Sequence, residues 1–423
     1  MNFEASSEYA KLKDKEDKLA AFKHKFYFPQ IHNKDVIYFC GNSLGLQAKT
    51  VEVAVQQELD DWKNLGIAGF LKAKNPWMYY QESFKKPLAA IVGCGEDEVT
   101  VMNSLTVNLH LLMLTFYRPT SSRFKIIMES GAFPSDQYAA ETQAKHYGFD
   151  PAEAVIEIAP REGEKTLRSE DILAIIEENA DSLALVMLGG INYYTGQLFD
   201  IKTITETTHK SGAIAGFDLA HAAGNVKLEL HNWNADFAVW CSYKYLNGGP
   251  GAVAGVYVHE KFATNPSTPR FAGWWGNDEE ARFKMEKGFI AKPNAGGWNI
   301  STAQILNMAS LKASLEIFEE AGFENITAKS KELTAYLEFL LKQLTNLNFQ
   351  IITPEDKESR GAQLSLYFKE RGKEIHEKMI NSGIVVDYRE PGVIRVAPAP
   401  LYCSFEDVFK FYEILKEISQ EEQ

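Results

Sequence analysis

The chain has 423 residues, of which 45% are hydrophobic and 24% are charged, as in ordinary globular proteins with a large core. Its formal charge is −13, from 44 Lys and Arg against 57 Asp and Glu, and it has no basic run, so we expect no nucleic-acid or anionic-membrane partner. The four cysteines are scattered without a CxxC or CxH pattern, which argues against a disulfide framework and against a structural zinc site, and we expect no bound metal.

The N-terminal residues carry mixed charges and no apolar signal segment, and no later stretch approaches the ~20 apolar residues of a membrane span. We therefore expect a cytoplasmic protein without a membrane segment. The first elements are an extended, glycine-punctuated segment at 38–46 (YFCGNSLGL) and a helix at 47–65, where apolar side chains recur at helical intervals.

From Phe124 onward, short apolar runs alternate with helical patterns, which is typical of βαβ units and predicts a mostly parallel sheet covered on both faces. The expected strands are FKIIMES, AVIEIAP, LALVMLGG, AIAGFDLA, DFAVWCSY and AVAGVYVHE. The glycine-rich loop KYLNGGPG between the last two should lie at a sheet end, where ligands usually bind.

After Trp298 the pattern changes to long amphipathic helices, the strand-like runs FQIITP, AQLSLYF and GVIRVAP, and a last helix, SFEDVFKFYEILKEI. This predicts a smaller α+β domain whose boundary lies inside a helix near residue 310. The expected division is residues 1–45 as an N-terminal segment packing with the small domain, 46–310 as the large domain and 311–423 as the small C-terminal domain.

Two residues at strand ends point to chemistry. Lys244 follows an apolar strand, and a lysine confined there can lose its proton and form an imine, although a solvated surface lysine is the usual alternative. Asp218 ends another apolar strand, where burial requires a cation such as a pyridinium nitrogen; a helix N-cap explains it equally well. Together they supply the amine and the carboxylate that an aldehyde-bearing pyridine cofactor needs.

Three further segments fit such a site, each with an ordinary alternative. Ser104 and Thr106 begin an apolar helix that could bind phosphate or simply be capped. Phe133 could cover a planar ring or only pack near its turn. Arg395, inside VIRVAPAP, suits the α-carboxylate of an amino acid or an internal salt bridge.

Five motifs in this order resemble the kynureninase family: GNSLGL at 41–46, FPSD at 133–136, NYYTGQ at 192–197, GFDLAHAAGNV at 216–226 and WCSYKYLNGGPG at 240–251. The resemblance runs from about residue 37 to the C-terminus. It implies the α/β fold of pyridoxal-phosphate-dependent transferases, with a mostly parallel seven-stranded sheet between helices and a smaller α+β C-terminal domain. It also implies pyridoxal 5'-phosphate as cofactor and, in tryptophan catabolism, hydrolysis of L-kynurenine to anthranilate and L-alanine, or of its 3-hydroxy form to 3-hydroxyanthranilate and L-alanine.

The resemblance also assigns residues, which we state as expectations. Lys244 would carry the cofactor as a Schiff base, Asp218 would contact the pyridine nitrogen, and Tyr243 would join the phosphate site and carry protons. Cofactor contacts are further expected from Leu105, Thr106, Phe133, Pro134, Ser135, Asp136, His221, Trp274 and Thr302. Substrate contacts are expected from Ser43, Phe70, His221, Thr302 and Arg395.

In this family each site is completed by the neighbouring subunit, which implies a homodimer in which Trp274 and Thr302 reach across the interface.

One departure from the family concerns Gly189, because relatives often have a hydroxyl residue at this position. Phe70 and Thr302 differ from the His and Asn pair of family members that prefer a ring hydroxyl, so the resemblance implies unhydroxylated L-kynurenine as substrate. The alternatives are a cysteine desulfurase or aminotransferase of the same fold, with Cys403 as the desulfurase candidate, and a cofactor-binding protein without catalysis. A nicotinamide dehydrogenase is disfavoured because no GxGxxG follows the first strand of the alternating region.

Overall fold

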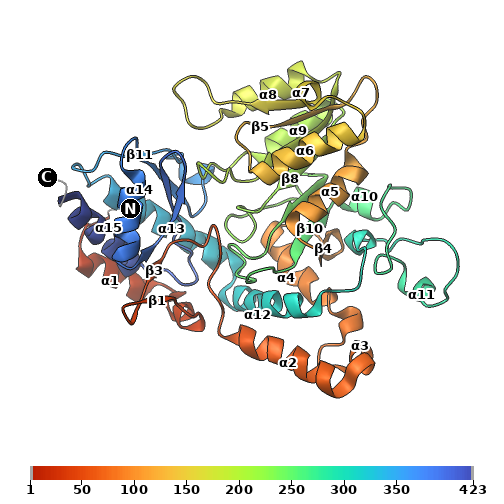
Figure 1. Cartoon of the computed structure of the whole chain (residues 1–423), viewed down its shortest axis with the longest axis horizontal. Coiled ribbons are helices and arrows are strands. Elements are labelled where there is room, and N and C mark those ends of the chain that lie inside the picture. The colour runs from red at the N-terminus through yellow and green to blue at the C-terminus, as the bar shows by residue number, and fades with distance from the viewer. Residues whose placement is uncertain (1–2, 421–423) are drawn as a thin grey trace.

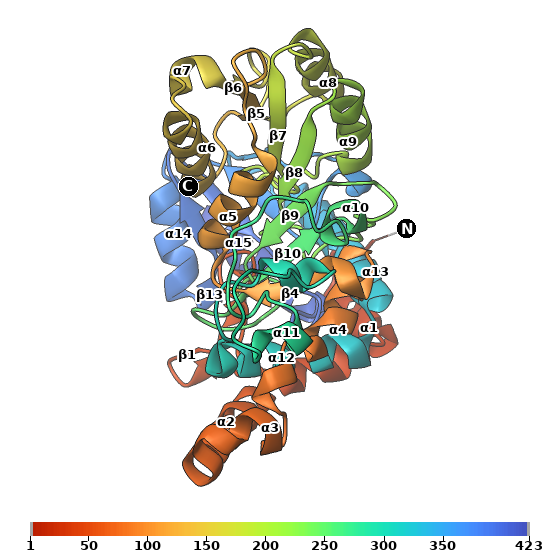
Figure 2. The same cartoon turned by 90° about the vertical axis from the view of Figure 1, so that its right-hand side faces the viewer.

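A seven-stranded sheet forms the centre of the computed structural model, which describes residues 3–420 (Figures 1 and 2). The strand order is β4-β10-β9-β8-β7-β5-β6, and only β10 runs against the others. The strands are β4 (Val99–Met102), β5 (Lys125–Glu129), β6 (Val155–Ile158), β7 (Leu183–Gly189), β8 (Ile214–Asp218), β9 (Phe237–Trp240) and β10 (Ala254–Val258). Six carboxyl ends therefore meet at one edge of the sheet.

Helices cover both faces of this sheet, which is why its strands read as continuous apolar runs. Along β5, Ile126 and Met128 face one buried cluster while Ile127 faces the other, as the two-residue period of a strand requires. The first cluster is covered by α5 (Leu105–Phe116) and α6 (Pro134–His146), and the second includes residues of α8 (Ser169–Glu178) and α9 (Ile201–Lys210). The central sheet is thus buried on both sides.

A second, antiparallel sheet has the order β11-β12-β15-β14. Its strands are β11 (Gln350–Ile351), β12 (Leu364–Tyr367), β14 (Asp387–Arg389) and β15 (Val393–Val396), and the neighbouring helices are α13 (Phe323–Leu341), α14 (Gly372–Asn381) and α15 (Phe405–Gln420). In Figure 1 this part lies to the left of the large sheet, in blue.

Residues 3–40 lie against this C-terminal part rather than against the large sheet. Helix α1 (Ser7–Glu16) packs on α15, and β3 (Ile37–Tyr38) pairs in parallel with β13 (Ile384–Val385). Lys23 Nζ lies 2.6 Å from Asp407 Oδ2. Helix α12 (Ile305–Ala321) runs through position 310 and packs against α2 (Thr50–Leu65) and α4 (Glu82–Val92). The division into three units stays a prediction.

Helices α2 and α3 (Gly69–Lys72) project from the rest of the chain at the bottom of Figure 2. The remaining elements of residues 3–420 are short. They are β1 (Gln30–Ile31), β2 (Lys34–Asp35), α7 (Pro151–Ala154), α10 (Glu260–Ala263) and α11 (Glu279–Arg282), besides six 3-10 turns in the same range. Within residues 3–420, no helix combines the length and apolarity needed to cross a bilayer.

The six strands expected in the alternating region all form, and the helix expected at 47–65 begins at Thr50. Strand β4 was not expected. Its four residues follow an acidic turn and are too short to show a periodicity, so only pairing with β10 defines them as a strand.

Candidate functional site

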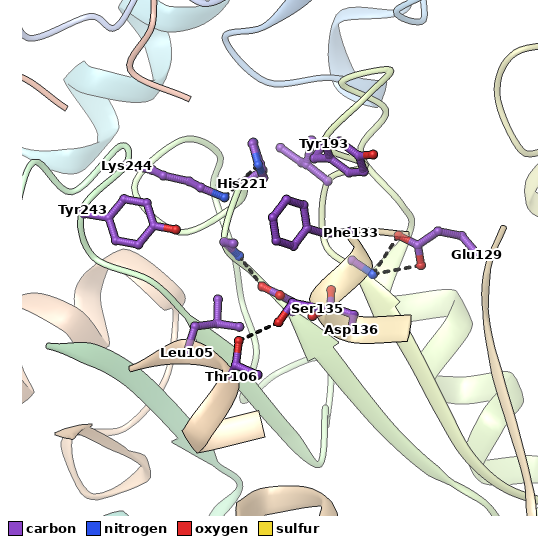
Figure 3. A pocket seen from close by; sticks show the side chains of 14 residues that line it. Leu105, Thr106, Glu129, Phe133, Ser135, Asp136, Tyr193, His221, Tyr243 and Lys244 are labelled. Atoms are coloured by element: carbon purple, nitrogen blue, oxygen red, sulfur yellow. Dashed lines mark hydrogen bonds between the residues drawn. The ribbon is translucent and has the colours of Figure 1, made fainter. Parts of the chain in front are cut away.

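A pocket of about 530 Å³ opens at the edge where the parallel strands end (Figure 3). Residues that follow β4, β5, β7, β8 and β9 line it, as expected for a parallel sheet, whose ligands bind beyond the carboxyl ends of the strands. The lining residues are Leu105, Thr106, Glu129, Phe133, Ser135, Asp136, Gly189, Ile191, Tyr193, Asp218, Ala220, His221, Tyr243 and Lys244.

Lys244 is only 8% exposed, so the surface-lysine alternative is wrong. The loop after β9 holds it through backbone hydrogen bonds: Asn247 N–H donates to Lys244 O at 2.9 Å, and Gly45 N–H donates to Tyr243 O at 2.8 Å. Lys244 Nζ lies 2.9 Å from His221 Nε2 and 5.8 Å from the centroid of the Phe133 ring. The amine therefore points into the pocket.

His221 is neutral in this setting. Burial, together with the positive charges of Lys244 and Arg395, holds its pKa well below the usual value of 6.5. A neutral imidazole can accept a hydrogen bond from Lys244 through Nε2. Its other nitrogen, Nδ1, is buried and has no hydrogen-bond partner among residues 3–420.

Asp218 and Asp136 form a buried carboxyl pair. Burial raises the pKa of both, but the pair is unequal because Asp136 donates a hydrogen bond to Asp218, which raises the pKa of Asp136 and lowers that of Asp218. Ala220 N–H donates to Asp218 Oδ1 at 2.7 Å, and the charge of Lys244 also favours ionised Asp218. Asp136 therefore holds the proton and Asp218 the negative charge.

The alternative that Asp218 caps a helix is partly correct. Its carboxylate accepts a hydrogen bond from the N–H group of Ala220, but a turn and not an α-helix follows. Asp136 Oδ1 is buried without a hydrogen-bond partner in the described part of the chain. Buried polar atoms of this kind are uncommon and indicate a missing partner.

Two helix N-termini meet on the opposite side of the pocket. Leu105 and Thr106 begin α5, while Pro134 and Ser135 begin α6, and the hydroxyls of Thr106 and Ser135 lie 2.6 Å apart. Unpaired backbone N–H groups and aligned peptide dipoles make helix N-termini favourable for anions. Tyr243 extends this side of the pocket, and burial raises the pKa of its hydroxyl, as does the neighbouring Cys241.

Arg395 is 1% exposed and lies on β15, opposite Asp387 on β14. Its Nη2 lies 2.7 Å from Asp387 Oδ2 and donates to Ser43 Oγ at 2.9 Å, and its Nη1 donates to Tyr193 O at 2.9 Å. Ser43 in turn donates to Asp387. The internal salt bridge is therefore real, and Tyr193, which also lines the pocket, connects this network to Lys244's surroundings.

Phe70, Trp274 and Thr302 do not lie in the Lys244 pocket. They line a second pocket of about 1190 Å³, together with Ile67, Leu71, Met78, Tyr79, Trp275, Glu279, Arg282 and Phe283. Several of its apolar side chains are strongly exposed, among them Ile67 at 84% and Phe283 at 60%. Within one chain, the structure thus separates these three residues from the other expected site residues.

Sequence reasoning missed Glu129, Tyr193 and Asp387. Glu129 lies in the expected strand FKIIMES and ends the observed β5, so an acid at the end of a buried strand was the signal that could have identified it. Asp387 gave no such signal, because only the register of β14 against β15 sets it opposite Arg395. Cys403, considered for a desulfurase, is buried, and its Sγ donates to Tyr38 O at 3.3 Å, so it has a structural role.

One group of residues at the other edge of the sheet has metal-ligand composition: Glu98, His231 and His259. Glu98 already accepts backbone N–H groups of Gly95 and Glu260 at 2.8 Å each, and His259 Nδ1 accepts the N–H of Lys261 at 3.2 Å. Hydrogen bonding within the fold accounts for this group.

Known structures share this fold at low identity. A cysteine desulfurase from Thermococcus onnurineus NA1 has a TM-score of 0.74 and 19% identity, with 91% of this chain and 95% of that chain covered. A cystine C–S lyase with its product cysteine persulfide has a TM-score of 0.76 and 16% identity over 92% and 99%. Another structure of that lyase, a mutant with glycine covalently linked to the PLP cofactor, has a TM-score of 0.78 and 15% identity over 93% and 98%. The expected fold class is confirmed.

The sequence comparisons are more specific. The kynureninase C-terminal domain model matches residues 326–415. A kynureninase of Flavobacterium psychrophilum is 53% identical over 98% of this chain and 99% of the relative, and one of Myxococcus xanthus is 51% identical over 98% and 97%. That of Mus musculus is 46% identical over 96% and 91%. With such identity along almost its whole length, the chain belongs to the kynureninase family.

Proposed function

We propose that this chain is a pyridoxal-phosphate-dependent kynureninase that hydrolyses the Cβ–Cγ bond of L-kynurenine to give anthranilate and L-alanine. The observation that carries the proposal is the convergence of Lys244 and Asp218 on one pocket in a chain about half identical to kynureninases. When bound, pyridoxal phosphate supplies an electron sink for bond cleavage next to the amino group.

The residues of the pocket fit this cofactor. Asp218, kept ionised by Ala220 and Asp136, suits a protonated pyridine nitrogen, and Phe133 offers an aromatic face at the N-cap of α6. Lys244 supplies the amine that holds an aldehyde. The unpartnered atoms Asp136 Oδ1 and His221 Nδ1 would gain a partner from a bound ligand.

The phosphate would lie where α5 and α6 begin, held by Leu105, Thr106 and Ser135. Backbone N–H groups of two helices and two hydroxyls 2.6 Å apart form a compact set of donors for an anion. Pro134 does not destabilise this helix start, because the N–H group of the first helical residue has no hydrogen-bond partner within the helix. Tyr243 would contribute a further hydroxyl.

Two groups of the chain would move protons. Lys244 Nζ, sheltered beside neutral His221, can take a proton from the substrate α-carbon and return it later. Burial raises the pKa of Tyr243, so its hydroxyl stays protonated at neutral pH and acts as a proton donor. A Tyr243→Phe protein with full turnover and normal cofactor affinity would remove Tyr243 from this role.

Arg395 would bind the substrate carboxylate, with Ser43 beside it. A guanidinium fork gives two charge-assisted hydrogen bonds to a carboxylate, and this one is fixed by Tyr193 O and Ser43 Oγ. His221 lies on the side of the pocket nearest Tyr193, with ring centroids 6.5 Å apart. The amino-acid part of the substrate would therefore lie between Lys244 and Arg395.

A homodimer would complete the site. The second pocket and its apolar side chains, including Ile67, Leu71 and Phe283, form a surface that is exposed to water in a single subunit. Exposure of so much apolar surface is energetically unfavourable. A second copy of the chain would cover this surface and bring Phe70, Trp274 and Thr302 to the partner's Lys244. Of these residues, Phe70 and Thr302 would lie near the aromatic ring of the substrate, and we infer from them a preference for L-kynurenine over its 3-hydroxy form. We also infer that the chain is a cytoplasmic enzyme of tryptophan catabolism.

The test is direct. Purified protein is mixed with pyridoxal phosphate, its visible absorption is recorded, and anthranilate fluorescence is followed after adding L-kynurenine. Wild-type protein and Lys202→Ala, an exposed lysine on α9, should show the band and release anthranilate, whereas Lys244→Ala should lose both. Cofactor binding with turnover of cysteine or of an amino-group acceptor instead would indicate a desulfurase or an aminotransferase. Absence of the band in wild-type protein would contradict the cofactor assignment.

A further inference from the structure

Glu129 is a third buried carboxyl at the edge of the pocket, and none of the steps above uses it. It is the last residue of β5 and is 4% exposed. Its two oxygens accept the N–H of Gly189, the last residue of β7, at 3.3 and 3.2 Å (Figure 3). The carboxyl is therefore fixed at the same sheet edge as Asp218.

Because Gly189 has no side chain, the carboxyl group of Glu129 can lie directly beside its backbone. A Cβ at position 189 would lie 2.9 Å from Glu129 Oε1, closer than such atoms approach each other, and the backbone of Gly189 is not in the left-handed region. The glycine is thus required by space and not by its own conformation.

Glu129 also separates two cavities. Besides the pocket of Lys244, it lines a neighbouring pocket of about 660 Å³ that contains Lys165, Asn192 and Thr195. Tyr193 lines both cavities as well. A carboxyl at this boundary can exchange its proton through the outer pocket without passing Lys244.

The surroundings of Glu129 make it titrate near neutrality. Burial raises its pKa to about 7; the Gly189 N–H acts against this rise, and the negative charge of Asp218 adds to it. Glu129 acts in turn on Asp136, because a negative charge on Glu129 raises the pKa of Asp136. The charged and titratable groups that line the two pockets together with Glu129 are Asp218 on β8, Asp136 on α6, His221 after β8, Tyr193 and Tyr194 after β7, Tyr243 and Lys244 after β9, and Lys165 before α8.

We propose that Glu129 is a positioning residue that controls the carboxyl pair: by adding its own negative charge, it keeps the proton on Asp136 and the charge on Asp218. This role rests on the proposed function, because the charge of Asp218 matters for catalysis only if it faces a pyridine nitrogen. Glu129 need not touch substrate or cofactor. It acts through Asp136 and Asp218, and it makes their charge depend on pH near 7.

The first test uses cofactor-free protein and needs no activity. Between pH 4.5 and about 7 the folded chain keeps a proton on Glu129 that the unfolded chain has released, so this group lowers stability as pH rises through that window. Glu129→Gln should therefore lose thermal stability less steeply than wild type over that range. Glu157→Gln, an exposed carboxyl on β6, should follow wild type.

The second test uses the cofactor-loaded protein. Removing the negative charge of Glu129 should lower the pKa that governs the visible absorption band by on the order of one pH unit, the effect of one nearby charge. Glu157→Gln should leave this pKa unchanged. Should Glu129→Gln fail to fold, Gly189→Ala gives an independent test. The added methyl group should push the Glu129 carboxyl away from the N–H group of residue 189. Because this hydrogen bond lowers the pKa of Glu129, its loss should raise that pKa and move the loss of stability to higher pH.

The outcomes are separable. A Glu129→Gln protein that binds pyridoxal phosphate but keeps both wild-type pH profiles overturns the role of Glu129 alone. A wild-type protein that binds no pyridoxal phosphate overturns the proposed function and this role with it. Shifted profiles in Glu129→Gln, with wild-type profiles in Glu157→Gln, support the role.

Discussion

Arg395 Nη2 lies 2.7 Å from Asp387 Oδ2, so the cation proposed to bind the substrate carboxylate already has a carboxylate partner within the chain. Burial acts to raise the pKa of Asp387, but the charge and hydrogen bonds of Arg395, with the Ser43 hydroxyl, lower it overall. The pair holds the guanidinium in place before substrate arrives. Because Nη1 and Nη2 both have partners, Arg395 is fixed in orientation as well as in charge.

This geometry predicts the effect of Arg395→Lys. An ammonium keeps the charge but cannot reproduce the planar fork, so one charge-assisted hydrogen bond, worth about 1.5–3 kcal/mol, should be lost. We expect KM for L-kynurenine to rise roughly tenfold or more while kcat changes less. Arg389→Lys is the matched control, since Arg389 also contacts Asp387 but is exposed. An unchanged KM in Arg395→Lys would contradict the carboxylate role.

His221 should make stability depend on pH. Its pKa is held well below 6.5 in the folded chain, so below about pH 6.5 the unfolded chain binds a proton that the folded chain does not. This lowers stability as pH falls. Thermal unfolding of cofactor-free protein between pH 8 and 5 should therefore show a smaller acid-side loss in His221→Gln than in wild type. His146→Gln, which changes an exposed residue on α6, should resemble wild type. Equal losses of thermal stability at low pH in wild type and in both variants would contradict a neutral His221 in the folded chain.

Gly45 should be intolerant of a side chain. A Cβ there would lie 2.5 Å from Lys244 O and closer still to Asn247 Oδ1, so Gly45→Ala should displace the loop that carries Lys244. We expect a loss of about 1–3 kcal/mol in unfolding free energy, as for other overpacked sites, and a fall in kcat. Gly95→Ala, whose Cβ would have its nearest neighbour at 3.4 Å, should change neither. Wild-type kcat in Gly45→Ala would show that the loop tolerates the shift.

The proposed homodimer, in which each subunit would complete the site of its partner, predicts complementation between two inactive proteins. Lys244→Ala and Trp274→Ala should each be inactive alone, because one lacks the amine and the other lacks the residue supplied to its partner. Random reassembly of an equal mixture gives half mixed dimers, each with one intact site, so activity should recover to about a quarter of wild type. A mixture of Lys244→Ala with Tyr243→Phe should recover none, since both changes affect the same side of the site. No recovery with Trp274→Ala would place Trp274 in its own subunit's site.

Much of the fold followed from local pattern. Apolar runs buried on both faces have to form central strands, so β5 to β10 were predictable from residues 124–260, and the position of Lys244 and Asp218 after two of them placed both at the same edge. The four residues of β4 were not, because they are too few to show a period. The helix starts at Leu105 and Pro134 were visible as well, but their meeting was not predictable, because α5 follows the unexpected strand β4.

The sequence by itself determined the fold class, the family and the amine and carboxylate of the pocket, because each depends on residue type next to a strand end. Only the tertiary structure decided the pairings: His221 with Lys244, Asp136 with Asp218, Glu129 with Gly189, and Arg395 with Asp387. It also separated Phe70, Trp274 and Thr302 from the pocket of their own chain. The physical reason is that each pairing depends on strand register and on the joint burial of segments that are distant in the sequence. Neither of these produces a periodic pattern of residues in the sequence.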